Sequence, residues 1–204
     1  MKTVALSLLL LCAVLPVPAA AQTADRPDIS VGDKWHFAMH WGDRSTKVDL
    51  LWEVTSVGPD RIEVAETTPA NPTPKPVLMT RELNVLESQR RKDSDLRQLN
   101  FPLVVGKSWT FENDYTLKDS GVSGHASYEV KVVGYGKVKV PAGEFDAFKV
   151  DAVGRWAAAA AGQSTATRVW WYAPSVRAIV RDEWRNPPYR PLTVFELESF
   201  TPAR

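Results

Sequence analysis

The sequence predicts an all-β protein, built as an antiparallel curved sheet or as a barrel-like sheet that closes on itself. Many short segments alternate apolar and polar residues, which is the period of a half-buried strand. Glycine- and proline-containing turns separate these segments, as in antiparallel β proteins. No stretch between residues 31 and 200 repeats its apolar residues with a helical period over three turns. Closure is favoured because it leaves no exposed edge strand.

The clearest of these segments is residues 128–150, which read YEVKVVGYGKVKVPAGEFDAFKV. Its first part alternates apolar residues with Glu129 and Lys131, and this predicts a strand. The Gly-Tyr-Gly sequence at 134–136 predicts a break in that strand. Residues 141–144 predict a tight turn, because proline presets φ and glycine tolerates a positive φ. We therefore expect a three-strand meander here.

Residues 1–21 have the features of a secretory signal peptide. Lys2 supplies the positive charge, residues 4–15 form the apolar run, and Ala21 ends a small-residue cleavage site. Cleavage after Ala21 predicts a periplasmic or secreted protein with no transmembrane helix after processing. A lipid anchor on Cys12 is disfavoured, because three leucines precede it where small residues are expected.

The composition of the rest of the chain narrows the classes of partner. The whole chain has 25 Lys and Arg and 24 Asp and Glu, and without Lys2 the two counts are equal, a balance that argues against nucleic acid as a partner. The single cysteine lies in the leader, so no disulfide is expected to stabilise the exported part. All eight tryptophans lie beyond the leader, which predicts a large core.

Residues 22–100 form the N-terminal β half of the predicted organisation. Residues 22–30 are expected to be a loose lead-in. The proline-rich residues 67–75 predict an extended, exposed loop, and the charged residues 88–98 predict a solvated linker or a short helix. Strands are expected at 35–41, 48–55, around 62–64, and within 77–87.

Residues 101–204 form the C-terminal β half, and they partly repeat the first half. The pattern V-G-x-x-W-x-F occurs at 31–37 and again at 105–111. Residues 52–58 and 128–134 are similar to each other at nearly the same offset. These matches predict two duplicated β-meander halves, with one continuous domain as the alternative. Further strands are expected at 165–172, 176–184 and 193–200, with a hairpin tip in the alanine run 157–161 and a rigid loop at 186–191.

Three motifs in the second half resemble a family of uncharacterised exported bacterial β proteins, some of them labelled TapB-like. The motifs are FPLVVGKSWTF at 101–111, VKVPAGEF at 138–145 and WWYAP at 170–174, in the expected order. The resemblance covers residues 101–184. It implies a curved β-sheet or barrel-like domain in the cell envelope, and it brings no established reaction and no catalytic residues.

Neither enzyme chemistry nor a metal site is predicted. A hydrolase needs an activated nucleophile beside a base, and no G-x-S-x-G sequence occurs. His36 and His40 share a strand face but are separated by roughly 13 Å of strand, too far for one zinc ion. His125 could join one of them only through tertiary folding. We expect no catalytic residues, no cofactor and no metal.

Aromatic residues provide the best functional clue. Trp170, Trp171 and Tyr172 place large rings on both faces of one predicted strand, and Trp184 follows on the next. Ring faces suit apolar or amphipathic ligands, although aromatic residues more often fill cores. These four are the candidate ligand-contacting residues of an exported, non-enzymatic β module that binds an apolar ligand or an envelope protein. The alternatives are a purely structural or assembly module and, third, an outer-membrane barrel.

Overall fold

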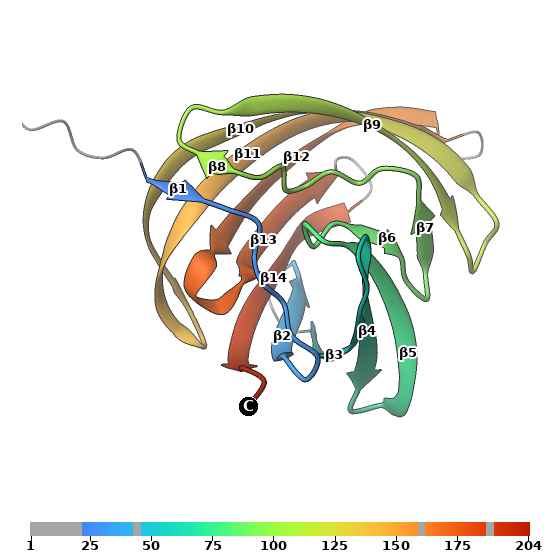
Figure 1. The fold of residues 1–204 in the computed structure, drawn as a ribbon. Helices are drawn as coiled ribbons and strands as arrows, with labels where there is room; N and C mark the ends of the chain where they lie inside the picture. The colour runs from blue at the N-terminus through green and yellow to red at the C-terminus, as the bar shows by residue number, and fades with distance from the viewer. Residues whose placement is uncertain (1–21, 43–45, 159–161, 187–189) are drawn as a thin grey trace, which may run out of the picture.

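The computed structural model describes residues 22–42, 46–158, 162–186 and 190–204. The predicted leader lies outside these residues. Twelve antiparallel strands close into one barrel in the order β10-β11-β12-β13-β14-β2-β3-β4-β5-β6-β7-β9 (Figure 1). The prediction of an all-β, barrel-like fold is therefore confirmed. Strands from residues 22–100 and from residues 101–204 belong to the same barrel.

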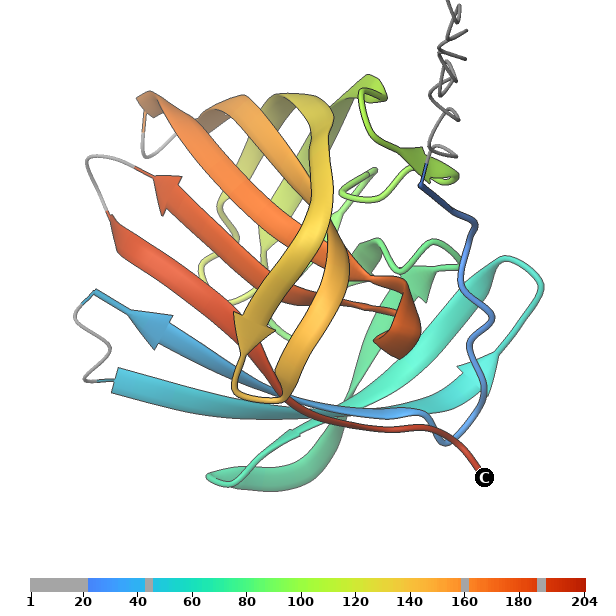
Figure 2. The same cartoon turned by 90° about the vertical axis from the view of Figure 1, so that its left-hand side faces the viewer.

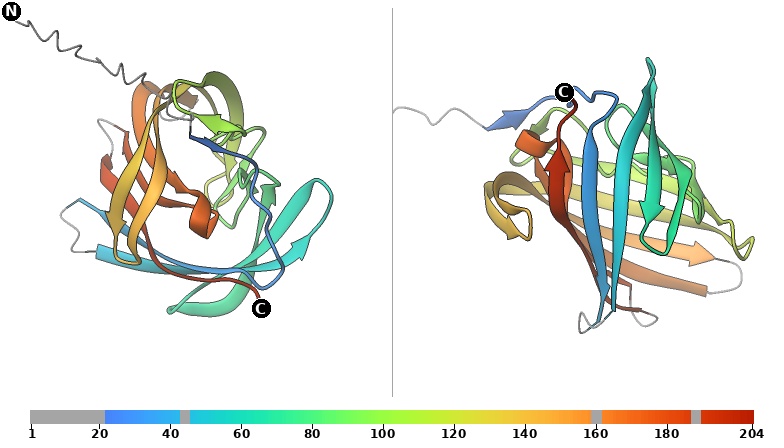
Figure 3. Two further views of the ribbon diagram at one scale, coloured as in Figure 1. Left: turned by 60° about the vertical axis from the view of Figure 1, so that its left-hand side comes forward. Right: turned by 90° about the horizontal axis from the view of Figure 1, so that it is seen from below.

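The barrel strands are β2 (Lys34–Trp41), β3 (Thr46–Val57), β4 (Arg61–Thr68), β5 (Asn71–Thr80), β6 (Val85–Glu87), β7 (Arg91–Asp93), β9 (Ser108–Leu117), β10 (Ser123–Val140), β11 (Gly143–Ala158), β12 (Gly162–Ala173), β13 (Ala178–Asn186) and β14 (Arg190–Thr201). The short strands β1 (Thr23–Ala24) and β8 (Leu103–Val104) form a separate ribbon, and a single 3-10 turn, η1 (Pro174–Val176), connects β12 to β13. Figure 3 shows the barrel from two further sides.

The strand alternation separates an apolar interior from a charged exterior. On β10, Val130 and Val132 are buried while Glu129 and Lys131 are exposed. Two apolar clusters fill parts of the interior, and between them they bury rings such as Trp35, Phe37, Trp109, Phe111, Phe148 and Trp170. Burial of these rings supplies the main driving force for folding in a chain without disulfides.

One end of the barrel is closed by chain segments that lie outside the barrel strands. Residues 22–33 run from β1 to β2, pass η1 (Figure 1), and bury Ile29 in the core. The fully buried Asp33 accepts hydrogen bonds from the Arg177 guanidinium and from the Ala203 backbone N–H, each at 2.9 Å. Trp35 donates its indole N–H to the carbonyl of Val176 at 2.9 Å. The N-terminal segment, the turn after β12 and the C-terminus are thereby joined at this end.

The predicted three-strand meander at residues 128–150 is wrong. β10 runs without a break to Val140 and pairs with β11 in a single long hairpin. The glycines accommodate a bulge between Val132 and Gly134 instead of a turn, since one extra residue shifts the register and bends the strand. Beyond the bulge the hairpin tip reaches β14 (Figure 2), where the Ala142 N–H donates to the Leu197 carbonyl at 3.0 Å.

Three segments predicted as loops or linkers contain strands. Residues 67–75 are the facing ends of β4 and β5, and residues 71–76 of β5 tolerate prolines because they pair with β4 alone. Residues 22–30 contain β1 and the buried Ile29. Residues 88–98 contain β7, whose Asp93 is buried because other side chains bond to it. These strands were not predicted because their charged residues and prolines are more typical of loops. The predicted tips at 157–161 and 186–191 lie largely outside the described residues.

The two V-G-x-x-W-x-F motifs adopt the same local structure. Gly32 and Gly106 both have positive φ, 96° and 93°. Their backbone N–H groups donate to the carbonyls of Val54 and Val132, at 2.9 and 2.8 Å. Each motif opens a strand, β2 or β9, that begins a meander. These matches support the predicted duplication, which stays a prediction.

Candidate functional site

A cavity of about 990 Å³ lies inside the barrel. Inward-facing side chains of the barrel strands line it. Its lining includes Asn71, the first residue of β5, and Gln89 and Arg90 in the turn between β6 and β7; all three are exposed and lie at the end opposite the closing segments. The cavity therefore reaches solvent at that end. Its volume is at the upper limit of typical small-molecule sites, which span roughly 300–1,000 Å³.

One wall of the cavity, which we call the apolar wall, comes from β2 to β5 and β14. Its apolar members are Trp35, Phe37, Met39, Val48, Leu50, Trp52, Val54, Ile62, Val64, Val77, Met79 and Phe195. Phe37 and Phe195 stack with their ring centroids 4.4 Å apart, and Phe37 meets Trp52 edge-on at 5.4 Å. Such contacts fix the rings and present a rigid apolar surface to the cavity.

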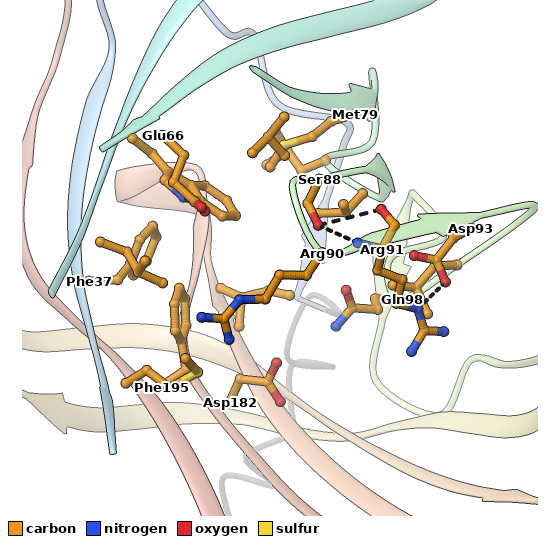
Figure 4. Close-up of a pocket in the computed structure, with 18 of the residues that line it drawn as sticks. Phe37, Glu66, Met79, Ser88, Arg90, Arg91, Asp93, Gln98, Asp182 and Phe195 are labelled. Atoms are coloured by element: carbon orange, nitrogen blue, oxygen red, sulfur yellow. Dashed lines mark hydrogen bonds and ion pairs between the residues drawn. The ribbon is translucent and has the colours of Figure 1, made fainter. Parts of the chain in front are cut away.

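The opposite wall, which we call the polar wall, comes from β7 and β9 to β13. Its charged and polar members are Arg91, Asp93, Gln98, Tyr115, Tyr128, Arg168 and Asp182, with Gln98 contributed by the segment between β7 and β8. Figure 4 shows Phe37 and Phe195 on one side of the cavity and Arg91, Asp93 and Gln98 on the other. The cavity is thus amphipathic along its length.

Arg168 and Asp182 are the central pair of the polar wall. The Arg168 Nε lies 2.8 Å from one carboxylate oxygen of Asp182 and 3.1 Å from the other, and Nη2 also donates to it. Burial opposes the charge on Arg168, but the Asp182 carboxylate outweighs it and raises the pKa of the guanidinium. With its amide oxygen turned toward Arg168, Gln98 accepts from Nη1 at 2.9 Å and from Nη2 at 2.6 Å. The guanidinium carbon also lies 5.7 Å from the centre of the Trp170 ring and 5.3 Å from that of Trp184.

Arg91 and Asp93 form a second pair on the same wall. Arg91 Nε donates to Asp93 at 2.6 Å, and the Asn113 amide donates to the same carboxylate oxygen at 2.6 Å. The Arg91 guanidinium lies 4.2 Å from the centre of the Tyr115 ring. Burial raises the pKa of the Tyr115 phenol, which therefore stays neutral at ordinary pH.

Two tyrosines lie flat against the polar wall because glycines face them across the sheet. Tyr128 is in register with Gly154, and Tyr115 with Gly124. A Cβ added at Gly154 would come within 2.3 Å of the Tyr128 ring, and one at Gly124 within 2.5 Å of the Tyr115 ring. Any larger residue would force these rings away from the wall and into the cavity. The two glycines therefore help to keep the cavity open.

Arg90 differs from the other arginines of the cavity. It lies in the turn between β6 and β7, and its side chain extends into the cavity toward Asp182 (Figure 4). No residue that the structure describes accepts a hydrogen bond or ion pair from its guanidinium, although Arg91, Arg168 and Arg177 each pair with an aspartate. Glu66, on the other side, accepts the indole N–H of Trp52 at 2.9 Å.

The structure separates the four residues predicted to contact a ligand. Trp184 lines the cavity, whereas the described lining does not include Trp170, Trp171 or Tyr172. Trp170 and Tyr172 are each 1% exposed in the core. Trp171 lies half-buried on the other face of β12, with Lys149 and Arg181 over its ring. The two-faced aromatic strand thus contributes Trp170 and Tyr172 to one apolar cluster and a half-buried Trp171 that packs against the other.

The charged members of the site were missed by sequence reasoning, although a signal was present. Arg168 alternates with Trp170, and Asp182 alternates with Trp184, so each occupies the apolar phase of its strand. A charged residue in that phase must find a partner inside the barrel. Nothing in the sequence indicated that these two residues lie side by side. Arg90 carries no such signal, because it lies in a turn.

The histidines occupy separate places on the barrel. His36 pairs with Asp49 and His125 with Asp114, at 2.9 and 2.8 Å. Within the described part of the chain, no group of three or more His, Cys, Asp and Glu side chains is arranged to hold a metal ion. The same part contains no helix that is long and apolar enough to cross a membrane.

Comparison with known proteins shows the fold. No protein-family model and no curated protein matches the chain, so the TapB-like name stays a prediction. Similar solved structures include a protein from Parabacteroides distasonis assigned as a lipoprotein, with a TM-score of 0.60 and 13% identity, covering 87% of this chain and 98% of that one. A protein from Bacteroides fragilis assigned as an exported protein with a YmcC-like fold has a TM-score of 0.58 and 16% identity, covering 87% and 99%. The hypothetical lipoprotein YmcC from Escherichia coli has a TM-score of 0.53 and 6% identity, covering 84% and 85%.

Proposed function

We propose that this protein is an exported, non-enzymatic module that holds an apolar or amphipathic ligand inside its barrel. The observation that carries this function is the cavity of about 990 Å³, whose apolar wall is rigid and whose lining reaches exposed residues at one end. An apolar cavity of this size forfeits dispersion contacts when empty, and a ligand chain restores them. Binding of apolar surface there adds roughly 25 cal/mol for each Å² removed from water.

Export is part of the proposal and is supported by the sequence of residues 1–21. The similar structures assigned as exported protein or lipoprotein support the same location. The test is the mass of the protein recovered from the periplasmic fraction of an expressing bacterium. A mature chain that begins at Gln22 is expected, and a full-length chain confined to the cytoplasm would contradict export.

The binding test uses an uncharged fluorescent naphthylamine, which reports apolar burial without a charge of its own. The folded wild-type protein is expected to bind it saturably, at about one probe per chain. Ala166→Phe places a ring inside the cavity from an inward position that is 8% exposed, so it should weaken binding. Val153→Phe adds the same ring at an outer position that is 58% exposed, and it should leave binding unchanged. Absence of saturable binding by the folded wild type would refute the proposal.

A purely structural or assembly module of the envelope is the second candidate. It is favoured by apolar side chains on the outside of the barrel, where Leu51 and Val153 are 43% and 58% exposed. It predicts a filled interior, which does not match the cavity. Crosslinking in intact cells should then capture one envelope protein on these side chains, independently of any probe.

A further inference from the structure

The geometry points to a single-chain amphipath with an anionic head group, a carboxylate or a phosphate, as the ligand of the cavity. The acid group binds Arg90 at the mouth, and the hydrocarbon chain lies along the apolar wall. This inference rests on the proposed function and specifies the chemistry of the ligand.

The charge balance of the polar wall favours an anion. Arg91 and Arg168 are paired with Asp93 and Asp182, and Asn113 and Gln98 complete those two networks. Arg177 is paired with Asp33, so Arg90 is the one arginine of the described lining whose donors no described residue accepts. Asp182 is engaged by Arg168 through both carboxylate oxygens, so it does not neutralise Arg90. Beside the polar wall, at the mouth of the cavity, Arg90 therefore adds one positive charge that no described carboxylate neutralises.

The chemistry of arginine suits this role. A guanidinium presents its N–H donors in a planar fork that matches carboxylate and phosphate oxygens. Arg90 extends into the cavity from a turn at the solvent-open end, with Phe37 and Phe195 on the far side (Figure 4). An acid group at Arg90 stays in reach of water, while the attached chain contacts the stacked rings.

The apolar wall determines which part of the ligand lies there. Glu66 is the one described carboxylate on that wall, and it already accepts the Trp52 indole N–H. A cationic head group would be attracted to Glu66 but repelled by Arg90 at the mouth of the cavity. The negative charge of Glu66 also disfavours an acid group on the apolar wall, which directs that group toward Arg90.

The test compares ligands with the same dodecyl chain and different head groups by titration calorimetry at pH 8. The probes are dodecanoate, dodecyl phosphate, the uncharged dodecanol and dodecyltrimethylammonium. We expect the better of the two anions to bind about tenfold or more tightly than dodecanol, because hydrogen bonds to charged groups have this order of magnitude. The ratio between the two anions distinguishes a carboxylate from a phosphate ligand.

Arg90→Gln should remove the preference for the anion and leave the affinity for dodecanol unchanged. Arg155→Gln makes the same charge change on the outer face of β11 and is the matched control. Equal binding of dodecanol and both anions by the wild type, tightest binding of the cation, or a preference that survives Arg90→Gln would overturn the inference and leave the proposed function intact. If none of the four probes binds the folded protein, the proposed function fails as well.

Discussion

Replacing Gly154 by alanine should destabilise the wild-type protein but stabilise a variant that lacks the Tyr128 ring. A Cβ at Gly154 would lie 2.3 and 2.4 Å from two ring carbons of Tyr128, far inside normal contact. In the wild-type background Gly154→Ala must displace the ring, which costs about 1–3 kcal/mol as in other overpacked sites. In a Tyr128→Ala background the same substitution meets no ring and stabilises by about 0.5–1 kcal/mol, the usual gain of Ala over Gly in a strand.

The assay is urea unfolding of the four proteins of this double-mutant cycle, followed by tryptophan fluorescence. The expected coupling between Gly154 and Tyr128 is about 1.5–4 kcal/mol, with a reversal of sign. In thermal unfolding, Gly154→Ala alone should lower Tm by about 3–10 °C for a chain of this length. Where Tyr128→Ala folds poorly, Tyr128→Leu serves the same purpose.

Gly136 provides the matched control for this cycle. It lies on β10, has no positive φ, and a Cβ added there meets no atom within 4 Å. Gly136→Ala should therefore be neutral or stabilising by up to about 1 kcal/mol. The steric reasoning fails if Gly154→Ala has the same effect with and without Tyr128, or if Gly136→Ala is equally destabilising.

Three further predictions concern stability. Asp182→Asn should cost about 2 kcal/mol in urea unfolding, less than the 3–5 kcal/mol of a fully buried pair because the Arg168 side chain is 22% exposed; a loss below about 0.5 kcal/mol would contradict this. Burial opposes ionisation of Asp49, but hydrogen bonds from His36 and Lys47 outweigh this effect and lower the pKa of its carboxyl group. The contribution of Asp49 to folding stability is therefore fully present above its pKa in the unfolded chain, and it is lost as the pH falls through its pKa in the folded protein. Asp49→Asn should therefore cost under about 1 kcal/mol at pH 7 and nothing near pH 2, and a constant difference would refute the linkage. Trp170→Ala should cost about 3–5 kcal/mol and Trp171→Ala clearly less, since only Trp170 is fully buried; equal losses would contradict this assignment.

The strands that sequence reasoning located best are those whose alternation is unbroken. The predicted strand at 35–41 matches β2 within one residue, and 165–172 lies within β12. In β2 the inward set consists of apolar residues, and in β12 it is apolar apart from Arg168, so burial enforces the register. Residues 128–150 misled because a glycine pair is compatible with a turn and with a bulge. The register with β11 decides between them, and that is a long-range property.

The cavity itself could not be predicted from the sequence. Whether Trp170 or Trp184 meets a ligand depends on which layer of the barrel each ring occupies, and both are inward-facing aromatic residues in the alternation. The open volume also depends on Tyr115 and Tyr128 lying flat on Gly124 and Gly154, which are cross-strand pairs. Such pairs are fixed by the barrel register, which a single sequence does not state.

The polar wall bears on what the barrel is for. An interior built only for stability would gain from apolar residues in place of Arg168 and Asp182, because desolvation of a buried ion pair often offsets its attraction. The charged pairs are instead gathered on one wall, while the other wall holds stacked rings and one described carboxylate, Glu66. The ion pairs Arg91–Asp93 and Arg168–Asp182 hold the polar side chains of the polar wall in place. Arg90 adds a charge that no described side chain neutralises. A barrel that encloses only hydrocarbon has no need of this asymmetry, whereas a barrel that must orient a molecule with one charged end requires it.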